Sequence, residues 1–186
     1  MFLESTYQPQ DKVPLDDLSI YDVAVLTAQI GDKPFLKRAS TGYLTTGMIQ
    51  MVCYIAQGRH IAATGRSLFR DDFFVIDNRI ESPKITNVFG NYDKRVTPFV
   101  ITESIKGLLT PTVRGFDSET NKMCQRLIYE IVPMDYKELM KTFRDTKPYQ
   151  EALKGPFKKI DKALIKEYFE AQIIKPTQVK DIQIGV

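Results

Sequence analysis

One long apolar stretch stands out in the pattern of hydrophobic and polar positions, between residues 47 and 69. Wound as a helix, it gathers its polar side chains within one narrow arc and covers most of the remaining circumference with apolar ones. The arc consists of Gln50, Cys53, Gln57, His60 and Thr64. Because a helix so widely apolar belongs in the middle of a domain, the stretch predicts a central helix that begins after Thr45 or Thr46 and ends near Gly65.

Amphipathic helices are predicted on both sides of this central one in the sequence. The first begins at the capping pattern formed by Ser19 and Asp22 and ends at Gly31. Another begins at Pro83, since proline suits the first turn of a helix, and it ends before Gly90. In both segments the apolar residues recur at helical spacing, so each helix has one apolar face.

Three helices are predicted in the C-terminal part of the chain. They run from residue 117 or 118 to Pro133, from the capping pair Asp135 and Glu138 to about residue 145, and from about residue 157 to 174. The four residues 146–149 are expected to end the second of these helices and to separate it from the last one. The face that the last helix is predicted to bury consists of Phe157, Ile160, Ala163, Leu164, Tyr168, Ala171 and Ile174.

A β element is predicted between the central helix and Pro83. Residues 73–77 are aromatic and β-branched residues followed by an aspartate, which favours a short strand. Its partner is expected near residues 95–101, and the segment 98–109 stays open between strand and helix. The predicted fold class is therefore mainly α: a single compact helical domain around a central apolar helix, with a small β-hairpin or short sheet.

The composition fits one soluble domain. The chain has 186 residues, of which 43% are hydrophobic and 26% are charged. We expect an extended N-terminal arm at residues 1–17, one helical domain at residues 18–175 and a C-terminal tail at residues 176–186. No run of about 18 apolar residues is present and no basic region precedes an apolar N-terminal segment, so we expect a cytoplasmic protein without a membrane span.

No motif in the sequence dictates a reaction. Cys53 and His60 are separated by about 10 Å of helix rise, which is too long for the hydrogen bond of a nucleophilic pair. Asp71 and Asp72 are adjacent and point to opposite faces of an extended chain, so they make poor acid–base partners. One histidine and two cysteines, without a Cys-x-x-Cys pattern, form no recognised metal site. We therefore expect a protein that is not an enzyme and that holds no cofactor and no metal.

Arginines gather around the exit of the central helix. The net charge of +3, from 26 basic and 23 acidic residues, is too balanced to indicate nucleic-acid binding by itself. Acidic residues also interrupt the arginines and weaken a phosphate-binding field, whereas Arg and Tyr beside an apolar helix are typical of protein interfaces. A protein partner is favoured over nucleic acid, and a solvated surface remains an alternative. The predicted partner-binding residues are Gln50, Tyr54, Gln57, Arg59, His60, Arg66, Arg70 and Arg79.

Positions between residues 50 and 69 also match, in order and spacing, the central motif of a known family. They are Gln50, Tyr54, Ala56, Gln57, Gly58, Gly65, Leu68 and Phe69. The stretch thereby resembles the Panacea domain, a phage-associated antitoxin family. Residues 79–89, 136–139, 147–152 and 160–169 are similar to later motifs of the family, so the resemblance covers most of residues 19–170.

The chain departs from the family pattern at several positions. Arg59 and Tyr149 stand where the family has tryptophan, and methionines replace lysines at the start of the central helix. The resemblance implies a cytoplasmic bacterial or prophage protein that neutralises a cognate toxin by direct contact, with delivery of the toxin to a protease in some relatives and no catalytic site. The alternative is a phage or mobile-element accessory protein that binds a host protein or nucleic acid.

Overall fold

The computed structural model describes residues 15–31, 44–96 and 118–174. Its helices are α1 (Ile20–Gly31), α2 (Thr46–Thr64), α3 (Pro83–Phe89), α5 (Ser118–Ile131), α6 (Tyr136–Arg144), α7 (Lys147–Lys154) and α8 (Lys162–Ile174). Its strands are β1 (Leu15–Leu18), β2 (Ser67–Phe69), β3 (Phe74–Ile76) and β4 (Arg79–Glu81). The mainly helical fold class with a small sheet is therefore confirmed. The segment that stayed open between strand and helix and the predicted C-terminal tail lie outside the described residues.

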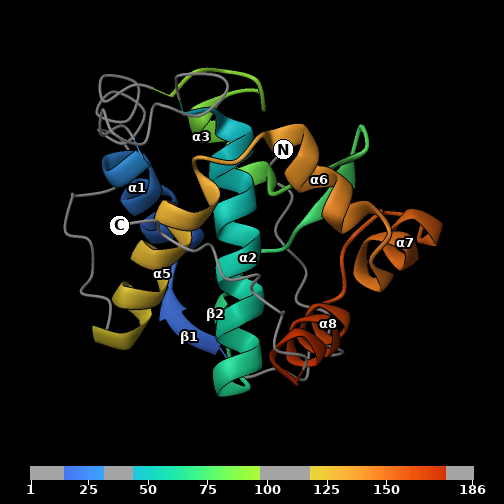
Figure 1. Cartoon of the computed structure of the whole chain (residues 1–186). Coiled ribbons are helices and arrows are strands. Elements are labelled where there is room, and N and C mark those ends of the chain that lie inside the picture. The colour runs from blue at the N-terminus through green and yellow to red at the C-terminus, as the bar shows by residue number, and fades with distance from the viewer. Residues whose placement is uncertain (1–14, 32–43, 97–117, 175–186) are drawn as a thin grey trace, which may run out of the picture.

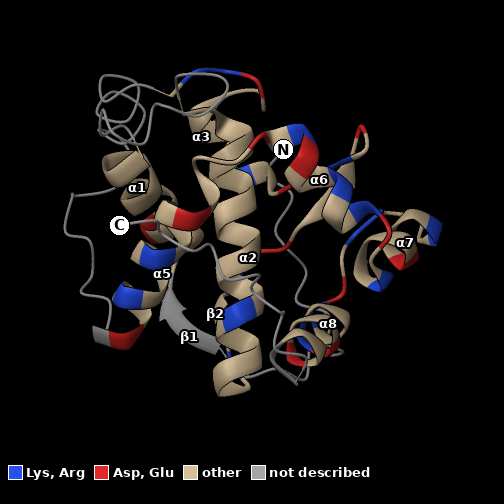
Figure 2. Ribbon diagram, in the orientation of Figure 1, with Lys and Arg blue, Asp and Glu red and all other residues tan. Residues whose placement is uncertain are grey.

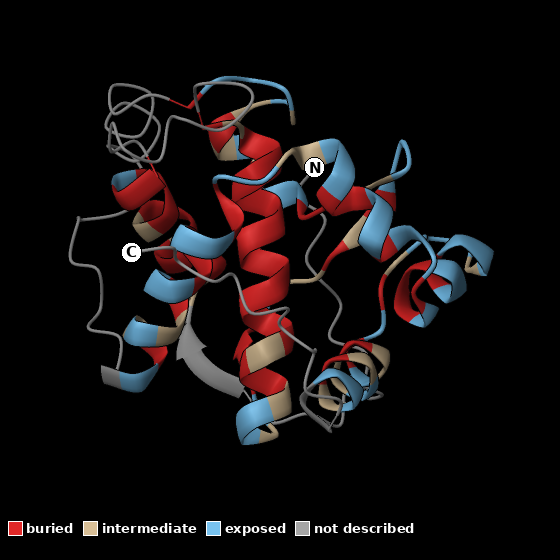
Figure 3. Cartoon of the chain, in the orientation of Figure 1, coloured by how far each residue is buried: buried red, intermediate tan, exposed pale blue. Residues whose placement is uncertain are grey.

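Helix α2 passes through the middle of the fold (Figure 1). Helices α1 and α5 pack against it on one side, and α8 packs against it on the other. Every α2 residue from Thr46 to Ile61 is buried except Arg59, and Figure 3 shows these residues as a nearly continuous buried column. The predicted central helix is present, and the burial of its apolar surface holds it in place.

Capping residues fix both ends of α2. The Thr45 hydroxyl accepts a hydrogen bond from Met48 N–H at 3.3 Å, so Thr45 is the N-cap. Gly65 ends the helix with a φ of 73°, a left-handed conformation that glycine adopts without strain. Inside the helix, Gly58 allows the close approach of α8, because a Cβ at this position would overlap the Phe169 ring.

Strands β3 and β4 form an antiparallel hairpin. Its turn residues, Asp77 and Asn78, have φ values of 46° and 61°. Two successive residues with positive φ are typical of the type I′ turn, whose twist matches that of a hairpin. The predicted strand is present, but this two-residue turn makes β4 its hairpin partner instead of the predicted residues 95–101, of which only 95 and 96 are described.

The segment between α7 and α8 borders the other edge of β3. Val75 N–H donates to Lys158 O at 2.8 Å, and Ile160 N–H donates to Phe73 O at 2.8 Å. These two bonds run in antiparallel register beside β3. The connection before α8 is therefore fastened to the hairpin along its length.

Strand β1 pairs in parallel with β2. Residues 15–17, which were predicted to be part of an extended arm, thus belong to the folded domain. The predicted boundary between residues 17 and 18 falls inside β1. Next to β2, the Asp71 carboxylate accepts a hydrogen bond from Ile20 N–H at 3.2 Å, which ties the start of α1 to the segment after β2.

The sequence signals for helix starts have the expected geometry. Ser19 N–H donates to the Asp22 carboxylate at 2.8 Å. Asp135 accepts hydrogen bonds from Lys137 N–H at 2.8 Å and Glu138 N–H at 3.1 Å. The spacing of α5 predicts an apolar stripe of Met123, Cys124, Leu127, Ile128 and Ile131. The last four of these are buried, and Met123 is partly buried against the core.

The C-terminal helices differ from the prediction. Residues 146–149 do end α6, but a further short helix, α7, begins there, because Thr146 is placed as an N-cap and Pro148 suits the first turn. Helix α8 begins at Lys162 rather than near residue 157. Phe157, which was predicted to be buried, is 81% exposed, because it lies in the turn before the helix.

The buried face of α8 also differs from the predicted one. It consists of Lys162, Ile165 and Phe169. Ala163 and Ala171 are exposed, because they lie on other sides of α8 than Ile165 and Phe169, which face the core. A charged residue takes an inner position here, because Lys162 finds a carboxylate partner in Asp72.

Candidate functional site

The predicted partner-binding residues do not share one surface. Gln50, Tyr54 and Gln57 are 0% exposed, and His60 is 5% exposed. Their predicted contact with a partner is not compatible with this fold, because α2 is surrounded by packed elements and its polar arc faces the interior. These four residues are therefore not part of the candidate partner-binding surface.

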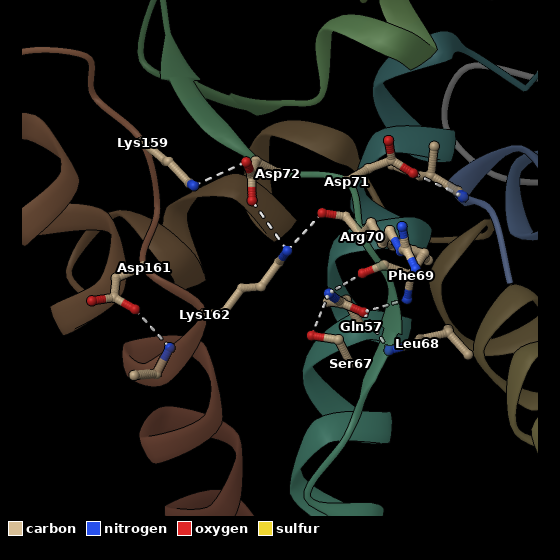
Figure 4. Close-up of polar contacts among 12 residues, drawn as sticks. Gln57, Ser67, Leu68, Phe69, Arg70, Asp71, Asp72, Lys159, Asp161 and Lys162 are labelled. Carbon is tan, nitrogen blue, oxygen red and sulfur yellow. Dashed lines mark hydrogen bonds and ion pairs between the residues drawn. The ribbon is translucent and has the colours of Figure 1, made fainter. Parts of the chain in front are cut away.

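Gln57 holds strand β2 against α2 (Figure 4). Its Oε1 accepts hydrogen bonds from Leu68 N–H at 2.9 Å and Phe69 N–H at 3.3 Å. Its Nε2 donates to Phe69 O at 3.1 Å and to the Ser67 hydroxyl at 3.4 Å. One buried amide thereby satisfies backbone groups that would otherwise be unpaired in the interior, which is a structural role.

Gln50 has the same role near the other end of α2. Its Oε1 accepts Ser82 N–H at 2.8 Å, and its Nε2 donates to Ser82 O and to the Thr86 hydroxyl, both at 3.1 Å. The Thr86 hydroxyl in turn donates to Glu81 at 3.2 Å. Gln50 thus fixes the junction between β4 and α3, and with it the position of Glu81.

Tyr54 is the aromatic centre of the core. Its ring makes edge contacts with Phe73, Phe143 and Phe169 at centroid distances of 5.3, 5.5 and 6.1 Å. Burial, and then the charge of Tyr168, raise the pKa of Tyr54. The buried hydroxyl has no hydrogen-bond partner within the described part of the chain.

The four arginines of the prediction lie at two separate places. Arg59, Arg66 and Arg70 lie at or beyond the C-terminal part of α2, and Arg66 and Arg70 are exposed. Arg59 forms a bidentate ion pair with Glu130 of α5, with both N–O distances at 3.0 Å. Figure 2 shows further basic residues on α5, the helix that packs against α2. Arg79 lies on β4, whose junction with α3 is bonded to the N-terminal half of α2.

Arg79 borders an open depression of about 470 Å³ between the hairpin and α3. We call it the Arg79 depression. Its lining consists of Ile76, Asp77, Arg79, Glu81, Pro83, Thr86, Asn87, Asn91, Tyr92 and Asp93. It is the candidate functional site, because it combines a surface concavity with one predicted partner-binding residue and an exposed apolar side chain.

The Arg79 side chain is held from three directions. Its Nε donates to Glu81 at 2.9 Å, and its Nη2 lies 3.3 Å from Asp77. The guanidinium carbon lies 3.9 Å from the centre of the Tyr92 ring, a cation–π contact. Burial lowers the pKa of Arg79, but the hydrogen bond and charge of Glu81 outweigh it and the net pKa is raised, so the positive charge is stabilised.

Tyr92 and Tyr136 pack against each other next to the Arg79 side chain. The Tyr92 ring lies 5.2 Å from the Tyr136 ring, and Tyr92 O accepts Gly47 N–H at 2.6 Å. The Tyr136 hydroxyl is buried without a partner in the residues that the structure describes. Its pKa is raised, chiefly by burial, with Arg79 acting in the opposite direction. The start of α2 and the start of α6 thus both fix the position of Tyr92.

The depression suits recognition of a polar protein surface. Its lining contains three carboxylates, those of Asp77, Glu81 and Asp93, and the single guanidinium of Arg79, which contacts the first two. Of these, Asp77 is 79% exposed and therefore available to a basic group of a partner. Sequence reasoning found only Arg79 in this set. The signal that could have led to the rest is the Asp77-Asn78 pair, which is typical of a hairpin turn and would have placed β4 beside α3.

Asp71 and Asp72 act separately, as the sequence predicts. Asp71 pairs with Lys84 of α3 at 2.5 Å. Asp72 pairs with Lys159 at 2.9 Å, and Lys162 Nζ lies 3.2 Å from its Oδ1, within ion-pair distance but outside hydrogen-bond geometry (Figure 4). Lys162 also donates to Arg70 O at 2.7 Å. These contacts fasten α1, α3 and α8 to the segment after β2.

The Cys53 thiol faces the core. Its Sγ lies 3.9 Å from Ile20 O, and burial, with smaller effects from Cys124 and Asp71, raises its pKa well above the ordinary value. A thiol in this environment is not a nucleophile at neutral pH. Among the described residues, no group of three or more His, Cys, Asp or Glu side chains is placed to hold a metal ion.

Comparison with protein-family models, with curated proteins and with solved structures found no match for this chain. The resemblance to the Panacea domain therefore stays a prediction. None of the described helices has the length and apolar character that crossing a membrane requires. What the fold and the site define is a mainly helical protein with a central buried helix and an open, charged depression beside a hairpin.

Proposed function

We propose that this protein binds another protein through the Arg79 depression, as a cytoplasmic antitoxin that neutralises a cognate toxin by direct contact. The observation that carries the proposal is the arrangement of Arg79, which is held between Glu81 and Tyr92 at the border of an open depression. Arg and Tyr are common anchors at protein interfaces. Side chains that are already held in place lose little conformational entropy on binding.

The resemblance to the Panacea domain supports the same proposal. Several matching positions have a role in this fold: Gln50 and Gln57 hold neighbouring backbone segments, Gly58 admits the Phe169 ring, and Gly65 ends α2. A motif whose residues have such internal roles determines the fold. The choice of partner then depends on the surface residues. A phage-associated, Panacea-like antitoxin fits this division, with the toxin as partner and a protease as a further one in some relatives.

Co-expression with the product of the adjacent gene tests the proposal. The expected result is that the product is toxic alone, and that this chain relieves the toxicity and co-purifies with it. Asp77→Lys should weaken the complex at least tenfold, because it reverses the charge of a 79% exposed carboxylate in the depression. Glu119→Lys on α5 is the matched control, since its side chain is 85% exposed and remote from the depression in sequence. A product that is not toxic, or that does not co-purify, would reject the proposal.

Nucleic-acid binding is the second candidate. It is favoured by the exposure of Arg66 and Arg70 and by the basic residues on the neighbouring helix α5 (Figure 2). Arg59 contributes little to it, because Glu130 neutralises its charge. A salt-dependent mobility shift with DNA or RNA, lost when Arg59, Arg66 and Arg70 are changed to Ala, would support this candidate against the first.

A further inference from the structure

Phe157 is by far the most exposed large apolar side chain in the described ranges. It is 81% exposed, whereas the next most exposed, Met134, is 43% exposed. An aromatic side chain of this size contributes most to stability when it is buried. Its exposure therefore does nothing for the fold, and a reason for it has to be sought in what the surface binds.

The turn that presents Phe157 is fixed to the hairpin. Lys158, the next residue, has a φ of 52°, a left-handed conformation that is uncommon for a residue with a side chain. Lys158 N–H donates to Gly155 O at 3.3 Å, and Lys158 O accepts Val75 N–H at 2.8 Å. On the C-terminal side of Lys158, the ion pair between Lys159 and Asp72 at 2.9 Å fixes the turn to the segment before β3 (Figure 4). The backbone thus holds Phe157 outward in one defined position.

Two further partly exposed apolar side chains lie on the elements next to this turn. Leu153, at the end of α7, is 36% exposed, and Ile76, at the end of β3, is 38% exposed. Helix α7 packs against β3, and the bond between Val75 and Lys158 brings the turn beside Ile76. A projecting aromatic ring with smaller apolar neighbours is the composition of an interface centre, in which one anchor fills a pocket.

The charges around Phe157 favour a protein partner over a membrane. Lys154 is paired with Glu151 at 2.6 Å, and Lys159 is paired with Asp72. Of the three lysines closest to Phe157 in sequence, Lys154, Lys158 and Lys159, only Lys158 has no ion pair with another described residue. Attraction to an anionic membrane needs several unpaired cations, whereas a single lysine beside an aromatic anchor complements one carboxylate at the border of a pocket.

We propose that Phe157 is the anchor of a contact with a protein partner that offers an apolar pocket with a carboxylate at its border. Leu153 and Ile76 contact the surround of the pocket, and Lys158 pairs with the carboxylate. This inference rests on the proposed function, because it takes as partner the same protein that the chain is proposed to bind. It adds a second contact region, on the turn between α7 and α8, which shares Ile76 with the Arg79 depression.

The test compares Phe157→Ser with Met134→Ser by titration calorimetry against the purified product of the adjacent gene. Phe157→Ser should weaken binding about 30-fold, as expected for the loss of an anchor residue, and Phe157→Tyr should bind within about threefold of the wild type. Met134→Ser, which removes an exposed apolar side chain from the turn between α5 and α6, should bind within about twofold. Equal thermal unfolding of the three variants and the wild type shows that folding is unchanged.

Other results separate the two proposals. Wild-type binding that is unaffected by Phe157→Ser would overturn the anchor and leave the proposed function standing, whereas no wild-type binding would overturn both. Two further measurements test other occupants of the surface. A wild-type dimer in sedimentation velocity that Phe157→Ser dissociates would assign the surface to a second copy. Co-sedimentation of the wild type with vesicles of neutral and anionic phospholipid, lost in Phe157→Ser, would assign it to a membrane.

Discussion

The interior of α2 and the turn between α7 and α8 depart from the usual distribution of side chains in opposite directions. The α2 arc buries polar side chains, and Gln50 and Gln57 find hydrogen bonds for both their donor and acceptor atoms. The α7–α8 turn exposes an apolar ring, and Phe157 is held outward by a fixed backbone. Buried polar and exposed apolar groups are the informative exceptions in a globular protein.

This difference separates the residues that determine the fold from those that can contact a partner. A buried amide that satisfies particular backbone groups fixes which segment packs against α2, because any other packing leaves those groups unpaired. An exposed ring fixes nothing inside the chain, since its removal leaves all internal contacts intact. The α2 arc therefore determines the fold, and the proposed recognition of a partner depends on the surface around β3.

The largest effect is expected from Ile55→Asp in α2. Ile55 is 3% exposed, and an unpaired carboxylate there costs several kcal/mol, roughly 4 or more, so the domain should unfold. Ala63→Asp, at the exposed end of the same helix, should change stability by less than about 1 kcal/mol. Circular dichroism during urea denaturation measures both. An unchanged transition for Ile55→Asp would refute the central position of α2.

A smaller but still large effect is expected from Gln57→Leu. The leucine has a similar volume but leaves two backbone N–H groups and the Phe69 carbonyl without partners, which costs about 2–4 kcal/mol. Gln125→Leu on α5 is the control, because Gln125 is exposed and bonds only to the Asn121 side chain. It should cost less than about 0.5 kcal/mol in the same urea titration. Equal costs for the two variants would show that Gln57 does not determine the packing of β2.

Much of the fold could be predicted from local signals. Caps and spacing predicted the starts of α1, α2 and α6, because Asp22, Thr45 and Asp135 act within a few residues of their own position. The pairing of the strands could not be predicted in the same way. The parallel pairing of β1 with β2 and the approach of residues 158–160 to β3 join segments that are distant in sequence, and no local pattern encodes such contacts.

The site was harder to predict than the fold. A polar arc on a helix indicates which residues share a face but not whether that face meets solvent or protein, so Gln50 and Gln57 were assigned to a partner. Likewise, Phe157 continues the apolar spacing of α8 and was assigned to its buried face. The chain turns at Lys158, whose φ is positive, and this turn separates Phe157 from α8. The sequence does not indicate the turn, because lysine rarely adopts a positive φ.

An effect of opposite sign is expected from Tyr54→Phe. The buried hydroxyl has no partner among the described residues, so its removal should raise stability by about 0.5–1 kcal/mol at neutral pH. Burial also raises the pKa of Tyr54, so the native state keeps its proton above about pH 10, where the unfolded chain loses it. The wild type should therefore lose stability as the pH rises beyond that value, and the variant should lose less.

Urea titrations between pH 7 and 11 measure this difference. Tyr129→Phe, at a tyrosine that is 41% exposed, serves as the control for loss of a hydroxyl and should change stability at neutral pH by less than about 0.5 kcal/mol. A destabilised Tyr54→Phe at neutral pH would show that the hydroxyl has a partner after all. That result would place Tyr54 with the two glutamines as a polar group that determines packing.

The smallest effect is expected from Arg59→Ala, at the one α2 residue between Thr46 and Ile61 that reaches the surface. Arg59 and Glu130 are 41% and 47% exposed, so solvent screens their bidentate pair, and a double-mutant cycle should give a coupling of about 0.5 kcal/mol that falls with salt. The control pair, Lys147 with Glu167, is 59% and 61% exposed and should give less. A coupling above about 2 kcal/mol would mean that the pair fixes α5 on α2 as the buried glutamines fix their segments. Arg59 would then help to determine the fold, as Gln50 and Gln57 do. A tryptophan at this position, as in the resembling family, would then require α5 to pack differently against α2.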